Sequence, residues 1–352
     1  MDLDHVDFQT TINEKDTDLF ILENKKGMKI AITNYGGRIV SWLAPDKQGD
    51  YNDIVLGFDS IQGYLNANEV YFGAIIGRYC NRIAEGTFSL NGEEYTLNTN
   101  DGSSHLHGGP GGFHTVVWDA KKLGEQHLVL NYISENGEEG YPGQLEVQVQ
   151  YILNDNNELK IDYTATTDKK TIVNLTNHAF FNLGGAASGT INNHELMINA
   201  EKYNPVDSTL IPTGKSETVE GTPFDFTESI EIEENLSSDN QQLQKGKGFD
   251  HNFVLNKDRQ ETLTMAASVY DQESGRILEI ETTEPGIQFY GGNFLDGSDI
   301  GKEGKPYKYR TAFCLEPQHF PNSPNIPIFP TTTLEPDSIY HSHSVYQLST
   351  NS

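Results

Sequence analysis

A histidine stands in an unusual setting at position 178. The stretch TIVNLTNHAFFNLGG, residues 171–185, begins with the alternation of a buried strand, but the polar pair Asn177-His178 then precedes the apolar run AFF. A histidine beside phenylalanines is costly to bury unless its ring nitrogens find hydrogen-bond partners. On its residues alone, His178 is consistent with a satisfied core histidine, a metal ligand or an acid–base catalyst.

A carboxylate occupies a similar apolar setting at position 316. Glu316 ends the run AFCLE, which has the composition of a core strand, and an unpaired carboxylate is expensive there. A buried salt bridge is the plain alternative, but the chain has only 24 Lys and Arg against 51 Asp and Glu to serve it. A second acid, Asp250, stands between aromatic residues in GKGFDHNF, where a turn former is an equally good interpretation.

Further polar residues gather in glycine-rich loops. They are Asn81 and Arg82 in GRYCNRIAEG, His105 and His107 in SSHLHGGPGGF, and Gln288 in EPGIQFYGG. Gly108 and Gly109 let the backbone pass close to a neighbour beside His107. The spacing of His105 and His107 is that of a metal pair on a strand, whereas a lone surface arginine most simply pairs with one of the many carboxylates.

Three kinds of site fit these residues. A metal site would use imidazole and carboxylate ligands suited to zinc or iron. Those ligands would be His105, His107 and His178 with Glu316 or His319. A glycosidase would pair two carboxylates such as Asp250 and Glu316. An acid–base site for a sugar would use one carboxylate and one protonatable imidazole. Spacing alone does not choose among them.

The elements that position these residues are predicted to be strands. LEVQVQYIL and LKIDYTATT alternate apolar and polar residues, with Asn154-Asp155-Asn156-Asn157 as the turn between them. TFSLNGEEYTL contains Asn91-Gly92 between alternating residues, which predicts a hairpin. Short helices are expected only at 229–236 and around 59–65. Many short strands separated by turns predict one all-β antiparallel domain over 1–352, a sandwich or a barrel.

Composition excludes several classes of partner. The formal net charge of −27 argues against nucleic acid and anionic membranes, and no run approaches the roughly 18–20 apolar residues of a membrane span. The N-terminal residues show no secretory signal, and Cys80 and Cys314 make neither a disulfide framework nor a zinc site. We therefore expect a soluble cytoplasmic protein with two reduced core thiols.

Ten segments, in order along nearly the whole chain, resemble the aldose 1-epimerase (galactose mutarotase) family. They are NYGGRIVSW, GRYCNRIAEGTFSLNG, HLHGG, GEEGYPG, NLTNHAFFNLGG, IPTG, GTPFDF, FDHNF, EPGIQFYGGNFLDG and LEPQHFPNSPN. Each segment is weak alone, but ten in the order of the family are specific. The resemblance implies a large antiparallel β-sandwich with few short helices, no metal and no cofactor.

The same resemblance implies roles for eight residues. The catalytic acid would be His178 and the catalytic base Glu316. The residues that contact the sugar would be Asn81, Arg82, His107, Asp250 and Gln288, together with Phe180 at a position where many members carry tyrosine. The partner would be a small aldose such as galactose or glucose, and the protein a monomer or homodimer. A glycoside-processing enzyme and a non-catalytic sugar-binding protein on the same fold are the alternatives.

Exchange of anomers needs one ionised and one protonated group at the same pH. Ring opening removes a proton from the C1 hydroxyl while the ring oxygen O5 gains one, and both oxygens are bonded to C1. Glutamate and histidine, with ordinary pKa values of about 4.3 and 6.5, meet that need. We expect the nearby Glu316 carboxylate to raise the pKa of His178.

Overall fold

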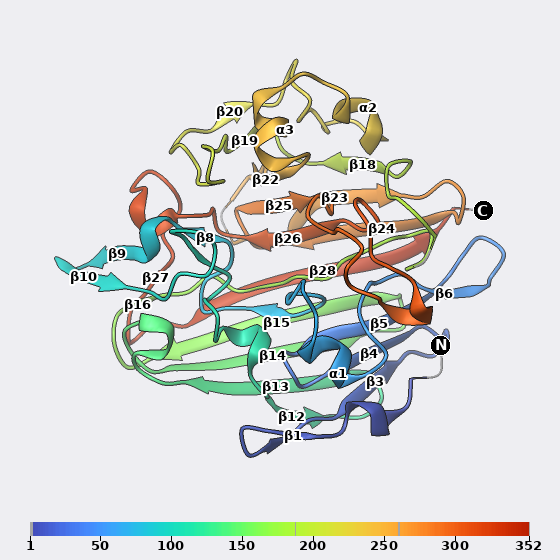
Figure 1. Ribbon diagram of the computed structural model, residues 1–352, viewed down its shortest axis with the longest axis horizontal. Coiled ribbons are helices and arrows are strands. Elements are labelled where there is room, and N and C mark those ends of the chain that lie inside the picture. Colours follow the sequence, from blue (N-terminus) through green and yellow to red (C-terminus); the bar gives the residue numbers. More distant parts are fainter. Residues whose placement is uncertain (1–2, 187, 260, 352) are drawn as a thin grey trace.

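A nine-stranded antiparallel sheet forms one layer of the computed structural model, which describes residues 3–186, 188–259 and 261–351. Its long strands cross the molecule side by side (Figure 1). In spatial order the strands are β12 (Asp119–Lys122), β13 (His127–Ser134), β14 (Leu145–Leu153), β15 (Glu158–Thr167), β28 (Tyr340–Thr350), β24 (Arg276–Thr282), β23 (Thr264–Tyr270), β18 (Glu195–Ile198) and β21 (Ile230–Glu231). The strand that ends the chain, β28, therefore lies in the middle of this sheet.

The alternation seen in the sequence sets the faces of these strands. Every second residue of β14 is buried, from Leu145 to Leu153, and β15 repeats the pattern. The two strands pair in register from Leu145 opposite Thr167 to Leu153 opposite Leu159, around the predicted turn. A strand with period two buries one face only, so this sheet needs a second layer.

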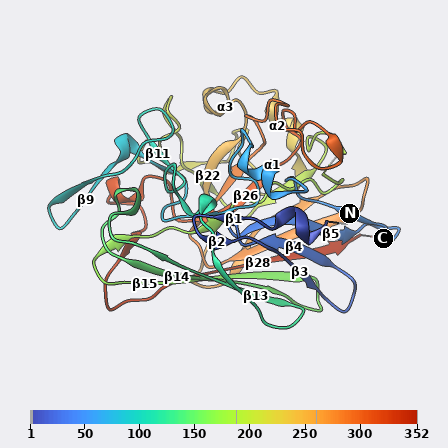
Figure 2. The same cartoon turned by 60° about the horizontal axis from the view of Figure 1, so that its bottom comes forward.

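Two smaller antiparallel sheets supply further layers. One consists of β20 (Glu217–Thr218), β19 (Lys202–Tyr203), β22 (Asp250–Val254), β25 (Gly286–Tyr290) and β26 (Cys314–Gln318). The other consists of β3 (Leu19–Glu23), β4 (Lys29–Thr33), β5 (Arg38–Pro45) and β6 (Tyr51–Asp53). Figure 2 shows β22, β26 and the three α-helices on one side of the long strands β13, β14 and β15.

Five two-stranded ladders complete the strands of the described residues. They are β1 (Thr11–Ile12) with β2 (Lys15–Asp16), β7 (Ile75–Ile76) with β17 (Thr176–Asn177), β8 (Arg82–Ile83) with β11 (His105–Leu106), β9 (Thr87–Leu90) with β10 (Glu93–Thr96), and β16 (Thr171–Ile172) with β27 (Thr333–Leu334). The predicted hairpin is confirmed as β9–β10, and Asn91 and Gly92 both adopt positive φ, 53° and 80°, as its tight turn requires.

Helices are short and few, as expected. The helices α1 (Ile61–Leu65) and α2 (Ile232–Leu236) fall within the two predicted regions. The helix α3 (Gln241–Gly246) was not predicted; Asn240 caps its first turn by accepting from the Gln242 N–H. Single 3₁₀ turns occur at His5–Phe8, Ala84–Gly86, Phe113–Thr115, Glu138–Gly140, Lys302–Gly304 and Ser323–Asn325.

One large hydrophobic cluster fills the space between the layers. It contains buried residues from Leu22 near the start of the chain to Leu348 near its end. The all-β antiparallel sandwich is thereby confirmed. Cys80 and Cys314 are buried free thiols, in agreement with the prediction. Within the described ranges, none of the helices has the length and apolar character needed to cross a membrane.

A buried ion pair ties the loop after β25 to the four-stranded sheet. The Lys302 ammonium donates to Asp53 Oδ2 at 2.6 Å and to the Val40 carbonyl at 2.7 Å. Their side chains are only 1% and 5% exposed. Removing one partner of such a pair leaves the other charge buried without compensation.

We predict that Lys302→Met lowers the free energy of unfolding by about 3–5 kcal/mol, because Asp53 then keeps a buried, unpaired carboxylate. Urea unfolding followed by fluorescence measures the change. Lys305→Met is the matched control, since Lys305 lies in the same loop with its side chain 54% exposed. Equal stability of the two variants would contradict the importance of the buried pair.

Candidate active site

The backbone fixes His178 at the end of the short strand β17. Its N–H donates to the Ala74 carbonyl at 2.8 Å, and its carbonyl accepts from the Gly73 N–H at 3.0 Å. The preceding Asn177 donates its side-chain amide to the Gly73 carbonyl at 2.9 Å. The asparagines of this stretch therefore bind backbone groups and hydroxyls and not the imidazole, whose Nδ1 lies 3.4 Å from the Cys314 thiol.

Glu316 lies on β26, at the edge of the five-stranded sheet. It stands opposite Gln288 on β25, whose side-chain amide donates to Asp250 Oδ1 at 2.7 Å. Gln288 is 3% exposed and does not line the cavity described below, so it orients Asp250 from behind. The sheet register explains why residues far apart in sequence meet here.

His178 and Glu316 face each other in a cavity of about 80 Å³. The Nε2 atom of His178 is 3.6 Å from Oε1 of Glu316, and the two residues are 5% and 2% exposed. The other carboxylate oxygen of Glu316, Oε2, is buried and has no hydrogen-bond partner among the described residues. An imidazole and a carboxylate thus share one small, water-poor space.

The structure brings six of the eight predicted residues to this cavity. Its lining consists of Glu69, Tyr71, Asn81, Arg82, Leu106, His107, His178, Asp250, Tyr290, Phe294 and Glu316. Phe180, like Gln288, is outside it. The phenyl ring of Phe180 is fully buried and stacks behind the imidazole of His178, with ring centroids 4.9 Å apart. Phe180 therefore contacts the predicted catalytic histidine and does not present its face to the cavity.

A strained loop pair holds Asn81 and His107. Both residues have positive φ, 61° and 53°. The Asn81 N–H donates to Nδ1 of His107 at 3.1 Å, so a neutral His107 carries its proton on Nε2. Gly108, with φ 86°, is required beside it, because a Cβ atom there would lie 1.7 Å from the Gly77 carbonyl oxygen.

Arg82 is the cation of the site. Its Nε donates to Asp101 at 2.7 Å, and its guanidinium lies 3.9 Å from Asp250. Asp250 is 9% exposed, and burial raises the pKa of its carboxyl despite the attraction of Arg82. Arg82 and Asp250 thus offer donors and acceptors side by side.

Burial shifts the pKa values of both predicted catalytic groups so that their neutral forms are favoured. It lowers the pKa of His178 to about 3, helped by the charge of Arg38. It raises the pKa of Glu316 well above its ordinary range, helped by Asp250 and Glu69. The expected rise in the pKa of His178 is therefore not found, because desolvation of the imidazole dominates and Glu316 is itself shifted toward its uncharged form.

Several histidines considered as metal ligands have other partners. His105 is fully buried, and its two ring nitrogens contact the Asn98 carbonyl and the Tyr141 hydroxyl, both at 2.6 Å. His319 lies in a different cavity, where its Nδ1 bonds to Glu284 at 2.6 Å. Among the described residues, only His107, His178 and Glu316 bring potential ligand atoms within 4.8 Å of one another.

Sequence reasoning missed four polar or aromatic residues of the cavity: Glu69, Tyr71, Tyr290 and Phe294. Tyr71 stacks over His178 with ring centroids 5.8 Å apart. Tyr290 and Phe294 stack on each other at 6.0 Å, and Phe294 is 44% exposed. An aromatic residue in a polar loop, such as Phe294 in GGNFLDG, is the sequence signal that could have predicted this aromatic part of the cavity lining.

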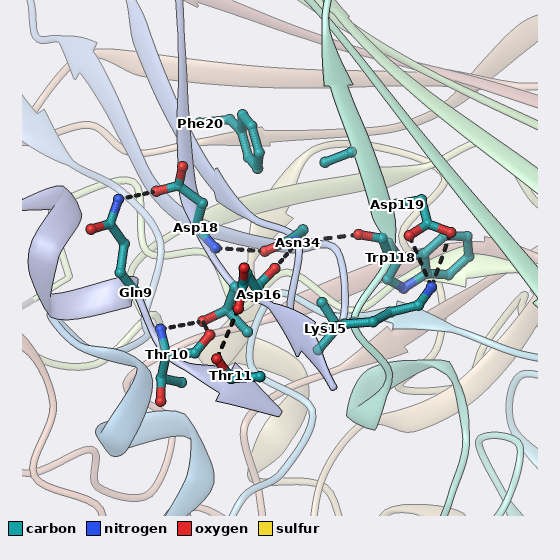
Figure 3. Close-up of a pocket in the computed structure, with 13 residues that line it drawn as sticks. Gln9, Thr10, Thr11, Lys15, Asp16, Asp18, Phe20, Asn34, Trp118 and Asp119 are labelled. Carbon is teal, nitrogen blue, oxygen red and sulfur yellow. Dashed lines mark hydrogen bonds and ion pairs between the residues drawn. The ribbon is translucent and has the colours of Figure 1, made fainter. Parts of the chain in front are cut away.

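A larger cavity, of about 750 Å³, lies under the N-terminal hairpin and is a poor candidate. Figure 3 shows that its polar groups pair with one another: Lys15 with Asp119, and Gln9 with Asp18. Asn34 is likewise bonded to the Trp118 carbonyl. Size alone does not make a site, and the smaller cavity is the one in which buried titratable groups converge.

Fold and site together define a β-sandwich protein in which a buried imidazole and a buried carboxylate meet in a cavity lined by polar and aromatic groups. The model of the family described as aldose 1-epimerase matches residues 18–347. The chain is 45% identical over 313 residues to galactose mutarotase of Homo sapiens, covering 89% of each chain. It is 37% identical over 331 residues to aldose 1-epimerase of Escherichia coli (strain K12), covering 94% of each.

A solved structure supports the same family assignment. A crystal structure of an aldose epimerase homologue from C. elegans matches with a TM-score of 0.87 and 30% identity, covering 96% of this chain and 100% of that one. The chain belongs to the aldose 1-epimerase family, whose members are isomerases. The resemblance noted in the sequence is confirmed.

The Glu284–His319 ion pair is expected to contribute to the free energy of unfolding in a pH-dependent way. Burial alone would lower the pKa of His319, but Glu284 raises it above 6.5; His319 in turn holds the pKa of Glu284 below 4.5 against burial. The contribution of His319 to the free energy of unfolding is complete below pH 6.5 and is lost as pH rises through its raised pKa. That of Glu284 is complete above pH 4.5 and is lost as pH falls through its lowered pKa.

We therefore predict that Glu284→Gln costs about 1–3 kcal/mol of unfolding free energy near pH 5.5, and less at pH 9. Chemical unfolding of both proteins at the two pH values measures the difference. A cost that grows from pH 5.5 to pH 9 would contradict the pairing.

Proposed function

We propose that this protein is an aldose 1-epimerase that interconverts the α- and β-anomers of free aldohexoses such as galactose and glucose. His178 is the proposed acid and Glu316 the proposed base. The observation that carries the proposal is the buried contact of 3.6 Å between His178 Nε2 and Glu316 Oε1 in one small cavity. Base and acid must act on O1 and O5, which are both bonded to C1, so such close convergence is what the reaction requires.

In the proposed opening step, the Glu316 carboxylate removes the proton of the C1 hydroxyl. The C1–O5 bond breaks as the C1–O1 double bond forms, and O5 takes the proton of His178. Rotation about C1–C2 turns the other face of the aldehyde toward O5. Closure reverses the transfers, so that His178 recovers its proton from the O5 hydroxyl and Glu316-H returns one to O1.

One proton shared by the pair is enough for this cycle. The form with neutral imidazole and protonated carboxyl has the same net charge as the form with imidazolium and carboxylate. Burial disfavours both gain and loss of a proton by the pair, and so protects the one-proton state. A C1 hydroxyl that donates to Glu316 stabilises its carboxylate, which favours the ionised form of the pair during reaction.

The remaining predicted residues are proposed to hold the pyranose. Arg82 and the Nε2–H of His107 are donors, and Asp250 is an acceptor, supported by Gln288. Contacts to hydroxyls other than O1 suit an enzyme that must accept both anomers. The proton on Nε2 of His107 suits a sugar oxygen better than a metal ion, which needs a free nitrogen lone pair. No metal or cofactor enters the proposed steps.

Phe180 is proposed to act on the sugar through His178. Its ring packs against the imidazole and against Phe72, with centroid distances of 4.9 Å and 4.7 Å. The apolar ring keeps water from that side of His178. The tyrosine hydroxyl common at this position in the family has no counterpart here.

We also infer the setting of the enzyme. A single domain over residues 1–352 is supported by the cluster that joins Leu22 to Leu348, and a cytoplasmic location by the two free thiols and the charge of −27. A monomer or homodimer acting on a small sugar is the proposed form. Sedimentation would distinguish the two.

We predict that Glu316→Gln lowers kcat for mutarotation at least about 10²-fold, because the amide cannot accept the C1 hydroxyl proton. Polarimetry on fresh α-D-galactose and α-D-glucose measures it. Glu234→Gln is the control, since Glu234 is an exposed residue of α2. More than about a tenth of wild-type kcat in Glu316→Gln would refute the assignment of the base.

Three further assays separate this proposal from its alternatives. EDTA should leave the rate unchanged, whereas a loss restored by zinc would favour a metal enzyme. A nitrophenyl galactoside should release no nitrophenol; release would indicate a glycoside-processing enzyme. Galactose binding without faster anomer exchange would indicate a sugar-binding protein.

The pH profile of kcat at saturating galactose is predicted to be flat through neutrality. Its acid limb reports a second proton on the pair and should lie below pH 4.3, since the pKa of His178 is lowered to about 3. Its alkaline limb reports loss of the shared proton and should lie well above the ordinary range of a glutamate, since burial raises the pKa of Glu316. Half-loss of activity between pH 6 and pH 7 would show independent, unshifted groups.

A further inference from the structure

A third carboxylate, Glu69, lines the cavity beside the proposed catalytic pair. It lies in the loop between α1 and β7, outside the ten motifs that mark the family. Its neighbours in the lining include Tyr71, Tyr290 and Glu316. Nothing in the proposed proton transfers uses it.

The loop presents this carboxyl group in a fixed position. Oε1 of Glu69 accepts from the Tyr71 N–H at 3.0 Å. The backbone N–H groups of Asn68 and Glu69 donate to the two carboxylate oxygens of Asp299, each at 2.9 Å. Asp299 is 7% exposed, so the loop is anchored to a buried group. Glu69 is therefore held by both its backbone and one of its two side-chain oxygens.

The second oxygen, Oε2, is unused by the protein. Over the described residues, no Lys, Arg or His nitrogen lies within ion-pair distance of Glu69, and only Oε1 has a hydrogen-bond donor. Burial raises the pKa of this carboxyl to about 7. Glu69 is only partly buried and its Oε2 is open to solvent in the cavity, so a ligand hydroxyl can take the place of water as its donor.

Glu69 and Asp250 both line the cavity that holds Glu316. Both raise the pKa of Glu316. They also come from different elements, the α1–β7 loop and the strand β22. A sugar whose C1 end meets His178 and Glu316 therefore enters a cavity whose lining offers Glu69 as well as Arg82 and Asp250.

We propose that Glu69 is a substrate-binding residue whose carboxylate accepts a hydrogen bond from a pyranose hydroxyl. This role rests on the proposed function, since it assigns a contact to the same sugar. It makes Glu69 a determinant of which aldoses are accepted, because a sugar without that hydroxyl leaves the carboxylate unpaired.

The variant Glu69→Gln tests the contact while it preserves the loop. The amide oxygen of glutamine still accepts from the Tyr71 N–H, so only the negative charge and one acceptor are lost. Glu303→Gln is the matched control, because Glu303 is an exposed residue, with a 62% exposed side chain. Assays at pH 8 keep Glu69 ionised.

The measurement is kcat/KM for anomer exchange of D-galactose and its 2-, 3-, 4- and 6-deoxy analogues. We expect Glu69→Gln to lower kcat/KM for galactose about tenfold, through KM, as for loss of a hydrogen bond to a charged group. For the one analogue that lacks the contacted hydroxyl, the loss should shrink to about twofold or less, as in a double-mutant cycle. An equal loss for galactose and all four analogues, or no loss at all, would overturn the proposal.

A direct measurement of galactose binding distinguishes failure of the Glu69 proposal from failure of the proposed function. Calorimetry of galactose with wild type and Glu69→Gln should show the same about tenfold loss of affinity. If wild type binds galactose without accelerating anomer exchange, the proposed function fails but the Glu69 contact is still tested. If wild type is active and Glu69→Gln binds as well as wild type, only the role of Glu69 is refuted.

Discussion

The site depends on the burial of an imidazole against a carboxylate with few counter-charges nearby. His178 and Glu316 are almost inaccessible to water, and one oxygen of Glu316 has no partner among the described residues. Each group is pushed toward its neutral form, and the pair is thereby restricted to a single proton. A reaction that moves one proton on and one proton off the sugar needs a pair of that kind.

The β-sandwich holds these two buried side chains in fixed positions through its backbone hydrogen bonds. Glu316 is fixed by the register of β26 with β25, and His178 by backbone hydrogen bonds to Gly73 and Ala74. Neither residue is placed by a flexible side-chain network. The large sheet contributes no residue to the cavity lining; it supplies the apolar layer against which the smaller sheets pack.

Much of the fold was readable from the sequence, because period-two burial and turn dipeptides are local signals. β14, β15 and the hairpin at Asn91-Gly92 follow directly from them. The six predicted residues that meet in the cavity came from motifs whose order along the chain carries family information. Glu69 had no such signal, since its role depends on where the α1–β7 loop lies in space. The direction of the pKa shift of His178 was also unpredictable, because it is set by the complete enclosure of the ring.

Phe180 shows how this enclosure and the chemistry are connected. A tyrosine at this position would need a partner for its hydroxyl, whereas Phe180 is fully buried among Phe72, Tyr290 and the imidazole. An apolar ring stacked on His178 removes water from one face and lowers the pKa of the imidazole. The same desolvation strengthens the attraction between imidazolium and carboxylate once the proton has moved to His178, because the local dielectric is low. The missing hydroxyl is therefore compatible with the proposed chemistry: the ring controls the polarity of the site, and the proton transfers remain with His178 and Glu316.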